Sequence, residues 1–217
     1  PSSLGKGSVA WFSNGASLEI TQNAKDGSTQ IKGILRNENL DNAEIGHLIF
    51  LSVWGGKNSE GLLGNGSVYD PLADTWTAIS NSNAPDKRTG HTAVWINGEL
   101  LVWGGEGETG VLNTGGRYSF AVDSWATLPT SAAPNARSGH SAISTGAKMI
   151  IWGGEGEGGL LRSGSVFDPS GNAGLGSWST MSTSNAPDAR SDHSAVRTGS
   201  EMIIYGGQTV DAEDNTA

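Results

Sequence analysis

Three arginines recur along the chain, and each stands three residues before a histidine. The Arg-x-x-His elements begin at Arg88, Arg137 and Arg190, at steps of 49 and 53 residues. Asp86 and Asp188 each stand two residues before one of these arginines. A guanidinium presents a rigid fork of donors that matches a carboxylate or another planar anion. The arginines are therefore candidates for binding a polar ligand, and the competing interpretation is that they pair with neighbouring acids and join successive repeat units.

The histidines of these elements, His91, His140 and His193, allow two interpretations. Neutral imidazoles can bind a metal ion at ~2.1 Å. Packing residues, in contrast to functional ones, recur in every unit of a repeat. We therefore expect a structural role, with each ring nitrogen bonded to the backbone, and no metal site. The chain has no cysteine, which excludes disulfides, thiolate metal sites and a cysteine nucleophile.

Glutamates follow in two glycine-rich segments, 105–110 with Glu106 and Glu108, and 154–159 with Glu155 and Glu157. Both segments match the pattern G-x-G-x-x-G. A dinucleotide site is rejected because no helix is predicted after either segment and the glutamates would repel a pyrophosphate. Weak cation binding by the carboxylates is one alternative, but the spacing matches no calcium loop. We expect exposed, solubilising loops and no cofactor.

A repeat of about 49 residues positions all of these residues. A Trp/Tyr-Gly-Gly triplet occurs four times, at steps of 49, 49 and 53 residues, beginning at Trp54, Trp103, Trp152 and Tyr205. A further tryptophan precedes each arginine by 12 residues, and each arginine precedes a triplet by 15. Such a fixed period indicates one structural unit that is repeated along the chain.

Each unit reads as strands. Residues 91–96 predict a first strand that ends at the turn Asn97-Gly98, and the apolar run 100–103 predicts a strand buried on both faces. The segments 66–71 and 164–169 predict a third strand, and the segment around Trp76 a fourth. Four short antiparallel strands per period are typical of a propeller blade, so the predicted fold class is all-β.

The pattern resembles the kelch-repeat family over about residues 45–207. The shared features are the Gly-Gly doublet after an apolar strand, the aromatic residue near Asp-Pro, and the tryptophan before the next unit. The resemblance implies a kelch-like β-propeller of four-stranded antiparallel blades. Some kelch-like proteins are copper galactose oxidases, whose tyrosine–cysteine cofactor cannot form here without cysteine. Others are sugar-acid epimerases, which use arginine, histidine and acidic groups at the channel.

The two ends of the chain look complementary. The last unit contains two inner strands, and residues 8–12 and 17–22 predict strands at the other end. We expect one domain, 1–217, of four blades closed by pairing of the terminal strands. Its units would span about 30–87, 88–136, 137–189, and a composite of 190–217 with 1–29. The alternatives are a fragment of a six- or seven-bladed propeller, or a partial ring that another chain completes by oligomerisation.

Composition narrows the classes of partner. The 217 residues carry a net charge of −9, which argues against nucleic acid as a partner. No segment approaches the ~20 apolar residues of a membrane-spanning helix, so no membrane insertion is expected. Glycine supplies 33 residues, roughly twice its usual share. We expect an extracellular or periplasmic protein.

The predicted site lies on one face of the propeller. Alternation of strands brings the connections before the first strand and after the second strand to the same face. This face would gather the charged residues Arg88, Arg137, Arg190, Glu106, Glu155, Asp86 and Asp188. We expect a non-catalytic binding or scaffolding module that recognises a glycan or a protein surface there. The alternative is a carbohydrate-active enzyme of the sugar-acid epimerase or lyase type, with the arginines clamping an anionic sugar at the channel mouth.

Overall fold

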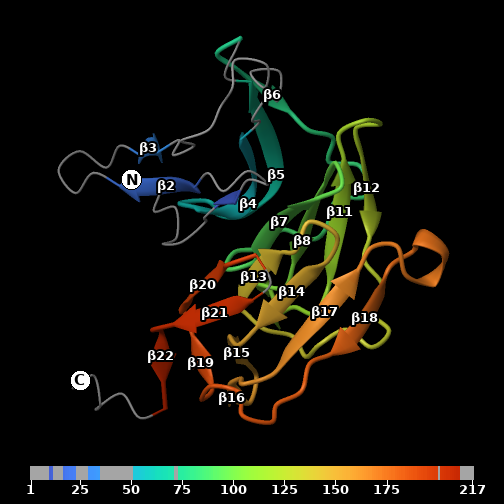
Figure 1. The fold of residues 1–217 in the computed structure, drawn as a ribbon. Helices are drawn as coiled ribbons and strands as arrows, with labels where there is room; N and C mark the ends of the chain where they lie inside the picture. The colour runs from blue at the N-terminus through green and yellow to red at the C-terminus, as the bar shows by residue number, and fades with distance from the viewer. Residues whose placement is uncertain are drawn as a thin grey trace.

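Antiparallel β-sheets make up almost the whole described part of the molecule. The computed structural model describes residues 10–11, 17–22, 29–34, 51–70, 73–199 and 201–210. Within these ranges the only helix is a three-residue 3-10 turn, Asn172–Gly174. No helix in the described part is long and apolar enough to cross a membrane. Successive sheets lie side by side in Figure 1, from β4–β6 through β7–β12 and β13–β18 to β20–β21.

Units two and three, named in chain order, are complete four-stranded sheets. Unit two has the sheet order β12-β11-β8-β7 and the strands β7 Thr92–Ile96, β8 Glu99–Trp103, β11 Gly115–Ser119 and β12 Ser124–Thr127. Unit three repeats this order with β13 Ser141–Ser144, β14 Met149–Trp152, β17 Gly164–Asp168 and β18 Ser177–Thr180. All neighbouring pairs are antiparallel, as the repeat predicts.

The remaining sheets have fewer described strands. Unit one consists of β4 Leu51–Asn58, β5 Gly61–Asp70 and β6 Thr75–Ala78. Unit four pairs β20 Ser194–Arg197 with β21 Met202–Tyr205, and β19 Arg190–Ser191 with β22 Gln208–Thr209. A separate sheet near the N-terminus contains β1 Ala10–Trp11, β2 Ser17–Gln22 and β3 Thr29–Ile34.

The turn Asn97-Gly98 joins the first two strands of unit two as predicted. Both residues have positive φ, 50° and 84°, which is the conformation of a two-residue hairpin turn. Ile96 pairs with Glu99 and Trp95 with Leu100 across the turn. This register places the apolar run of β8 in the middle of the sheet.

Strand β8 is buried on both faces, which confirms the interpretation of its continuous apolar run. Leu100 and Val102 join a core cluster with Trp54 of unit one. Leu101 and Trp103 join a second cluster with Met149 and other residues of unit three. The two clusters of buried residues therefore lie between successive sheets, one between units one and two and the other between units two and three.

Two small hairpins follow the Gly-Gly doublets, where the sequence had indicated only loops. They are formed by β9 Glu106–Gly107 with β10 Gly110–Val111, and by β15 Glu155–Gly156 with β16 Gly159–Leu160. Gly110 and Gly159 have φ of 130° and 104°, a conformation that glycine adopts readily and other residues rarely. It allows the chain to reverse direction within the hairpin. We call residues 105–112 and 154–161 the hairpins.

The predicted composite blade is not tested by the described strands. Among the described strands, β20 pairs with β21, and β2 pairs with β1 and β3. No described strand of one of these sheets pairs with a described strand of the other. Residues 8–9, 12 and 211–217, on which closure also depends, lie outside the described part. The blade number, the closure of the ring and the unit boundaries stay predictions.

Candidate functional site

The segments around the arginines lie against the hairpins. We call residues 86–91, 135–140 and 188–193 the lead segments. Thr89 and Glu106 exchange two backbone hydrogen bonds, of 3.0 and 2.7 Å, and Ser138 and Glu155 exchange two of 2.9 and 2.8 Å. The prediction that these two kinds of connection share one face is confirmed, and we call it the loop face.

Arg88 and Arg137 are buried within this face, with 0% and 1% of their surface exposed. Each donates to main-chain carbonyls of its own unit. For Arg137 the bonds run from Nη1 to the oxygens of Gly153 at 2.9 Å and Ser163 at 2.8 Å. Nε donates to the Asn135 oxygen at 3.0 Å, and Arg88 repeats the arrangement. With a further bond from Nη2 to the hydroxyl of the same Ser163 or Thr114 residue, four of the five N–H donors of each arginine are satisfied inside the protein.

The backbone of the same arginine bonds to the preceding unit. The Arg137 oxygen accepts from the Gly105 amide at 2.8 Å, and its amide donates to the Leu112 oxygen at 3.2 Å. Arg137 therefore fastens unit two to unit three. Burial lowers the pKa of Arg137 to about 10, and within the described part neither Arg137 nor Arg88 pairs with a carboxylate. One interpretation of the sequence was that these arginines pair with neighbouring acids and so join the units. The structure shows that Arg137 does join two units, but its hydrogen-bond partners are carbonyl oxygens and not carboxylates.

Arg190 is held less completely than its two counterparts. Nη1 donates to the Gly206 oxygen at 2.9 Å and Nε to the Asp188 oxygen at 3.1 Å, both in an exposed setting. The residue that corresponds to Ser163 lies at position 216, outside the described part. Asp86 and Asp188 accept from their arginines through the main chain, and their side chains are exposed. Ligand binding by the seven predicted residues stays a prediction.

The histidines also form hydrogen bonds across the boundaries between units. His140 Nε2 lies 2.8 Å from Thr92 Oγ1 in the preceding unit, and His193 Nε2 lies 2.8 Å from Ser141 Oγ. The expected partner was the backbone, which His91 has in Trp54, whereas for His140 and His193 the structure supplies a hydroxyl. The His140 ring packs edge-on against Trp103 with centroids 5.3 Å apart. Among the described residues, no three His, Asp or Glu side chains gather in a metal-binding arrangement.

Burial keeps these imidazoles neutral. It lowers the pKa of His140 to about 3 and the pKa of His91 to about 4. The positive charge of the arginine three residues earlier, Arg137 or Arg88, lowers each pKa further. His193 follows the same pattern, with its pKa also lowered to about 4, mainly by burial. A neutral imidazole can share one hydrogen bond with a hydroxyl and pack against an indole without burying a charge.

The first glycine of three of the doublets, at Gly55, Gly104 and Gly153, makes room for a histidine. Gly104 has φ of +68°, and a Cβ there would lie 2.6 Å from His140 Cε1. Gly153 has the same φ and the same relation to His193. The doublet is thus required by both the backbone conformation and the close approach of the ring.

A groove of about 310 Å³ opens on the loop face between the two hairpins. It is lined by Glu106, Gly110, Val111, Ser138, Glu155, Gly156 and Glu157. The three glutamates are exposed, and none of them forms an ion pair with a described residue. The neighbouring Glu108 pairs with Lys87 at 2.6 Å. The groove offers carboxylates to a cationic group and an apolar side chain, Val111, beside them.

The sequence had assigned two of the groove residues, Glu106 and Glu155, to the site. Glu157 had been noted as a neighbour on the same face, whereas Ser138 and Val111 were missed. Ser138 could have been found from its place directly after Arg137. Val111 gave no signal, because a single apolar residue in a glycine-rich loop has no pattern around it.

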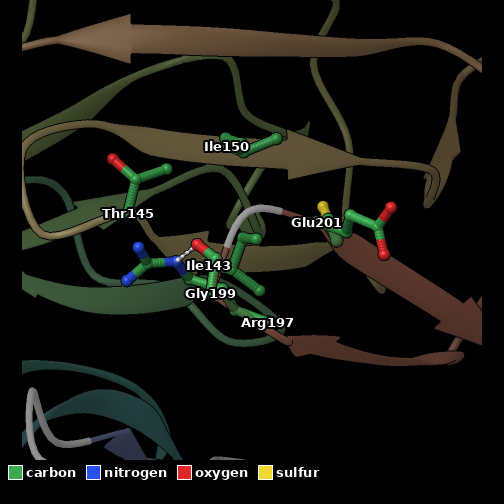
Figure 2. A pocket seen from close by; sticks show the side chains of 7 residues that line it. Ile143, Thr145, Ile150, Arg197, Gly199 and Glu201 are labelled. Carbon is green, nitrogen blue, oxygen red and sulfur yellow. Dashed lines mark hydrogen bonds between the residues drawn. The ribbon is translucent and has the colours of Figure 1, made fainter.

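A second, smaller hollow lies at the opposite end of the strands. Figure 2 shows it between the turns of β13–β14 and β20–β21, where Arg197 Nε donates to the Gly199 oxygen at 2.8 Å. Its volume is about 40 Å³, and it is lined by Ile143, Thr145, Ile150, Arg197, Gly199, Glu201 and Met202. A space of this size holds one or two waters and no organic ligand.

Comparison with known families agrees with the architecture. Residues 43–216 match the family described as the KLHDC2/KLHL20/DRC7 Kelch-repeats domain. No curated protein matches the chain significantly. The family match spans most of the chain and confirms the predicted family and the kelch β-propeller fold class. The chain belongs to the kelch-repeat family, whose domains mediate protein interactions, and it is a non-catalytic binding or scaffold module of that kind.

Proposed function

We propose that the chain binds a protein partner on the loop face, in the groove between the two hairpins, and that the partner presents lysine or arginine side chains. The observation that carries the proposal is the placing of three exposed carboxylates, Glu106, Glu155 and Glu157, around one groove. Exposed carboxylates without an internal cation are free to accept charge-assisted hydrogen bonds.

Hydrogen bonds hold the backbone around the groove. Ser138 lines the groove, and the adjacent Arg137 is fixed by hydrogen bonds to units two and three. Backbone bonds between Ser138 and Glu155 fix the wall of the groove in the same way. A preorganised surface loses little conformational entropy on binding, which favours affinity.

Charge and shape favour a basic peptide segment over a glycan. The net charge of −9 attracts a basic partner over long range. None of the residues that line the groove is aromatic, so it offers no ring on which a sugar could stack. A peptide with one or two basic side chains fits a shallow groove that carries carboxylates and one apolar contact.

A phage-displayed library of random dodecapeptides, selected on the whole chain, tests the proposal. We expect enriched peptides to contain lysine or arginine and to bind more weakly at high salt. The triple variant E106Q/E155Q/E157Q should bind them at least about tenfold more weakly, which corresponds to about 1.4 kcal/mol. Glu201→Gln, at the opposite end of the strands, is the matched control and should bind like the parent chain.

Selection of no peptide, or of peptides that bind the triple variant equally well, would overturn the proposal. A glycan array probed in parallel separates the two ligand classes that the sequence left open. Glycan binding that disappears in the triple variant would assign the groove to a sugar instead of a basic peptide.

A further inference from the structure

The lead segments and hairpins of units two and three correspond residue for residue. Thr89 pairs with Glu106, and Ser138 pairs with Glu155, through the same two backbone hydrogen bonds. The two pairs are 49 residues apart in the sequence, so position 87 corresponds to position 136 and position 108 to position 157. The boundary between units one and two can therefore be compared directly with the boundary between units two and three.

At the boundary between units one and two, a lysine of the chain itself binds the hairpin carboxylate. Lys87 Nζ lies 2.6 Å from Glu108 Oε1, and both side chains are exposed. The lysine stands where the two units meet, because a Cβ added to Gly64 of unit one would lie 3.1 Å from the Lys87 Cβ. An internal ammonium therefore satisfies Glu108.

At the boundary between units two and three, the corresponding carboxylate has no such partner. Ala136 stands in the place of Lys87, and its side chain ends at Cβ. Its carbonyl oxygen would lie 2.9 Å from a Cβ added to Gly156, the residue before Glu157. Glu157 is exposed, lines the groove and forms no ion pair with a described residue. No lysine of the chain therefore stands where Lys87 reaches the hairpin at the other boundary.

A second pair of corresponding positions changes charge in the same direction. Lys57 pairs with Leu62 across the hairpin of unit one, as Glu106 pairs with Val111 across the hairpin of unit two. Glu106 lines the groove, so a glutamate stands there in the place of a lysine. The buried arginine of the lead segment is present at both boundaries and does not alter the comparison. The groove therefore differs from its counterpart by the loss of two lysines.

We propose that a lysine of the partner takes the place at Glu157 that Lys87 takes at Glu108, and that Ala136 is the residue that leaves this place free. The proposal rests on the proposed function of the groove and narrows its ligand from a basic group to a primary ammonium. The model for the contact is an ion pair inside the same molecule, between two elements with the same backbone pairing. An ammonium is a compact charge on a flexible stem, and a planar guanidinium does not reproduce its geometry.

A lysine introduced at position 136 should act as a competitor that is built into the chain. Because it is tethered to the lead segment, its effective concentration at Glu157 is of the order of millimolar. It therefore displaces a free lysine side chain that binds more weakly than this. Removal of Lys87 has the opposite consequence and exposes Glu108 to an external ammonium.

Zero-length carbodiimide crosslinking tests the proposal, with acetyl-tetralysine amide as the probe and peptide mass spectrometry as the readout. The reagent joins a carboxylate to an amine in contact with it, with loss of water. In the parent chain we expect an internal crosslink between Lys87 and Glu108. The probe should crosslink to Glu157 at least about threefold more than to Glu201, an exposed glutamate at the opposite end of the strands.

Three variants then separate charge from size. Ala136→Lys should form an internal crosslink between the introduced lysine and Glu157, and should lower the probe crosslink there at least about threefold. Ala136→Met, the matched control, adds an uncharged side chain of similar length and should leave the probe crosslink unchanged. Lys87→Met should raise the probe crosslink at Glu108 at least about twofold.

The proposed function and the role of Ala136 fail in different ways. A parent chain in which Glu157 crosslinks no more than Glu201 would overturn both. Preferred crosslinking at Glu157 that Ala136→Lys leaves unchanged, or that Ala136→Met lowers equally, would overturn the role of Ala136 and leave the proposed function standing. Circular dichroism verifies folding. If Ala136→Lys does not fold, Lys87→Met decides, and no gain at Glu108 overturns the proposal.

Discussion

The lead segments and the hairpins lie side by side on the loop face, and both carry charge, but they use it differently. Arg88 and Arg137 of the lead segments are buried and bonded to carbonyls. Glu106 and Glu155 of the hairpins project from backbone that is paired with those lead segments, and their side chains remain exposed. The comparison separates charge that joins units from charge that is available to a partner.

Loss of a buried arginine should have the largest effect on stability. Arg137→Ala leaves the Gly153 and Ser163 carbonyls without their donor inside the protein, and each unpaired buried group is costly. We expect the free energy of unfolding to fall by about 3–5 kcal/mol. Arg190→Ala, whose bonds are exposed, should lower it by about 1 kcal/mol. Urea denaturation of the two variants measures the difference, and equal losses would contradict the assignment of Arg137 to the boundary.

The second-largest loss of stability is expected on substitution of the first glycine of a Gly-Gly doublet. Gly104→Ala forces a side chain into positive φ and brings its Cβ to 2.6 Å from His140, so we expect a loss of about 2–4 kcal/mol. Gly146→Ala is the matched control, with φ of +93° and no atom within 4 Å of the added Cβ. It should cost about 1 kcal/mol, from backbone strain alone. Thermal unfolding compares the two variants, and similar losses would remove the histidine contact from the explanation.

Stability should fall on mild acidification. The pKa of His140 is about 3 and that of His91 about 4 in the folded chain, below the ordinary value of 6.5. The unfolded chain therefore binds more protons between pH 6.5 and about 4, and stability decreases as the pH falls through this window. Each histidine contributes a slope of about 1.4 kcal/mol per pH unit. Denaturation at several pH values should show a shallower slope in His140→Gln, and an unchanged slope would argue against a neutral buried ring.

The smallest effect on stability is expected in the hairpins. Lys87→Met removes the exposed ion pair with Glu108, which should change the free energy of unfolding by less than about 1 kcal/mol. Glu157→Gln should change it by less than about 0.5 kcal/mol, because surface substitutions of this kind are nearly neutral. Differential scanning calorimetry measures both variants. A large loss in either would mean that the hairpins also hold the units together.

Much of the fold was predictable because the repeat fixes it. The spacing of Trp54, Trp103 and Trp152 located the units, and the turn Asn97-Gly98 and the apolar run before Trp103 located two strands of unit two. The small hairpins were missed because Glu-Gly-Glu segments lack the alternating apolar residues that indicate strands. Their pairing arises from contact with the lead segments, which are distant in sequence.

The site was predictable in place but not in detail. The common face of arginines and glutamates followed from the strand order. The burial of Arg88 and Arg137 did not, because arginine is seldom fully buried. One signal was available: a threonine or serine stands 26 residues after each of these arginines, at Thr114 and Ser163, and its hydroxyl accepts a hydrogen bond from Nη2 of the arginine.

The central claim is that charge on the loop face divides into a joining set and a contacting set. Arg88 and Glu106 test it most directly, because their segments are hydrogen-bonded to each other within one unit. The substitutions Arg88→Met and Glu106→Gln each remove one charge, and urea denaturation measures the stability of each variant. We predict a loss of about 3–5 kcal/mol for Arg88→Met and less than about 0.5 kcal/mol for Glu106→Gln. Equal losses, or a larger loss for Glu106→Gln, would contradict the division.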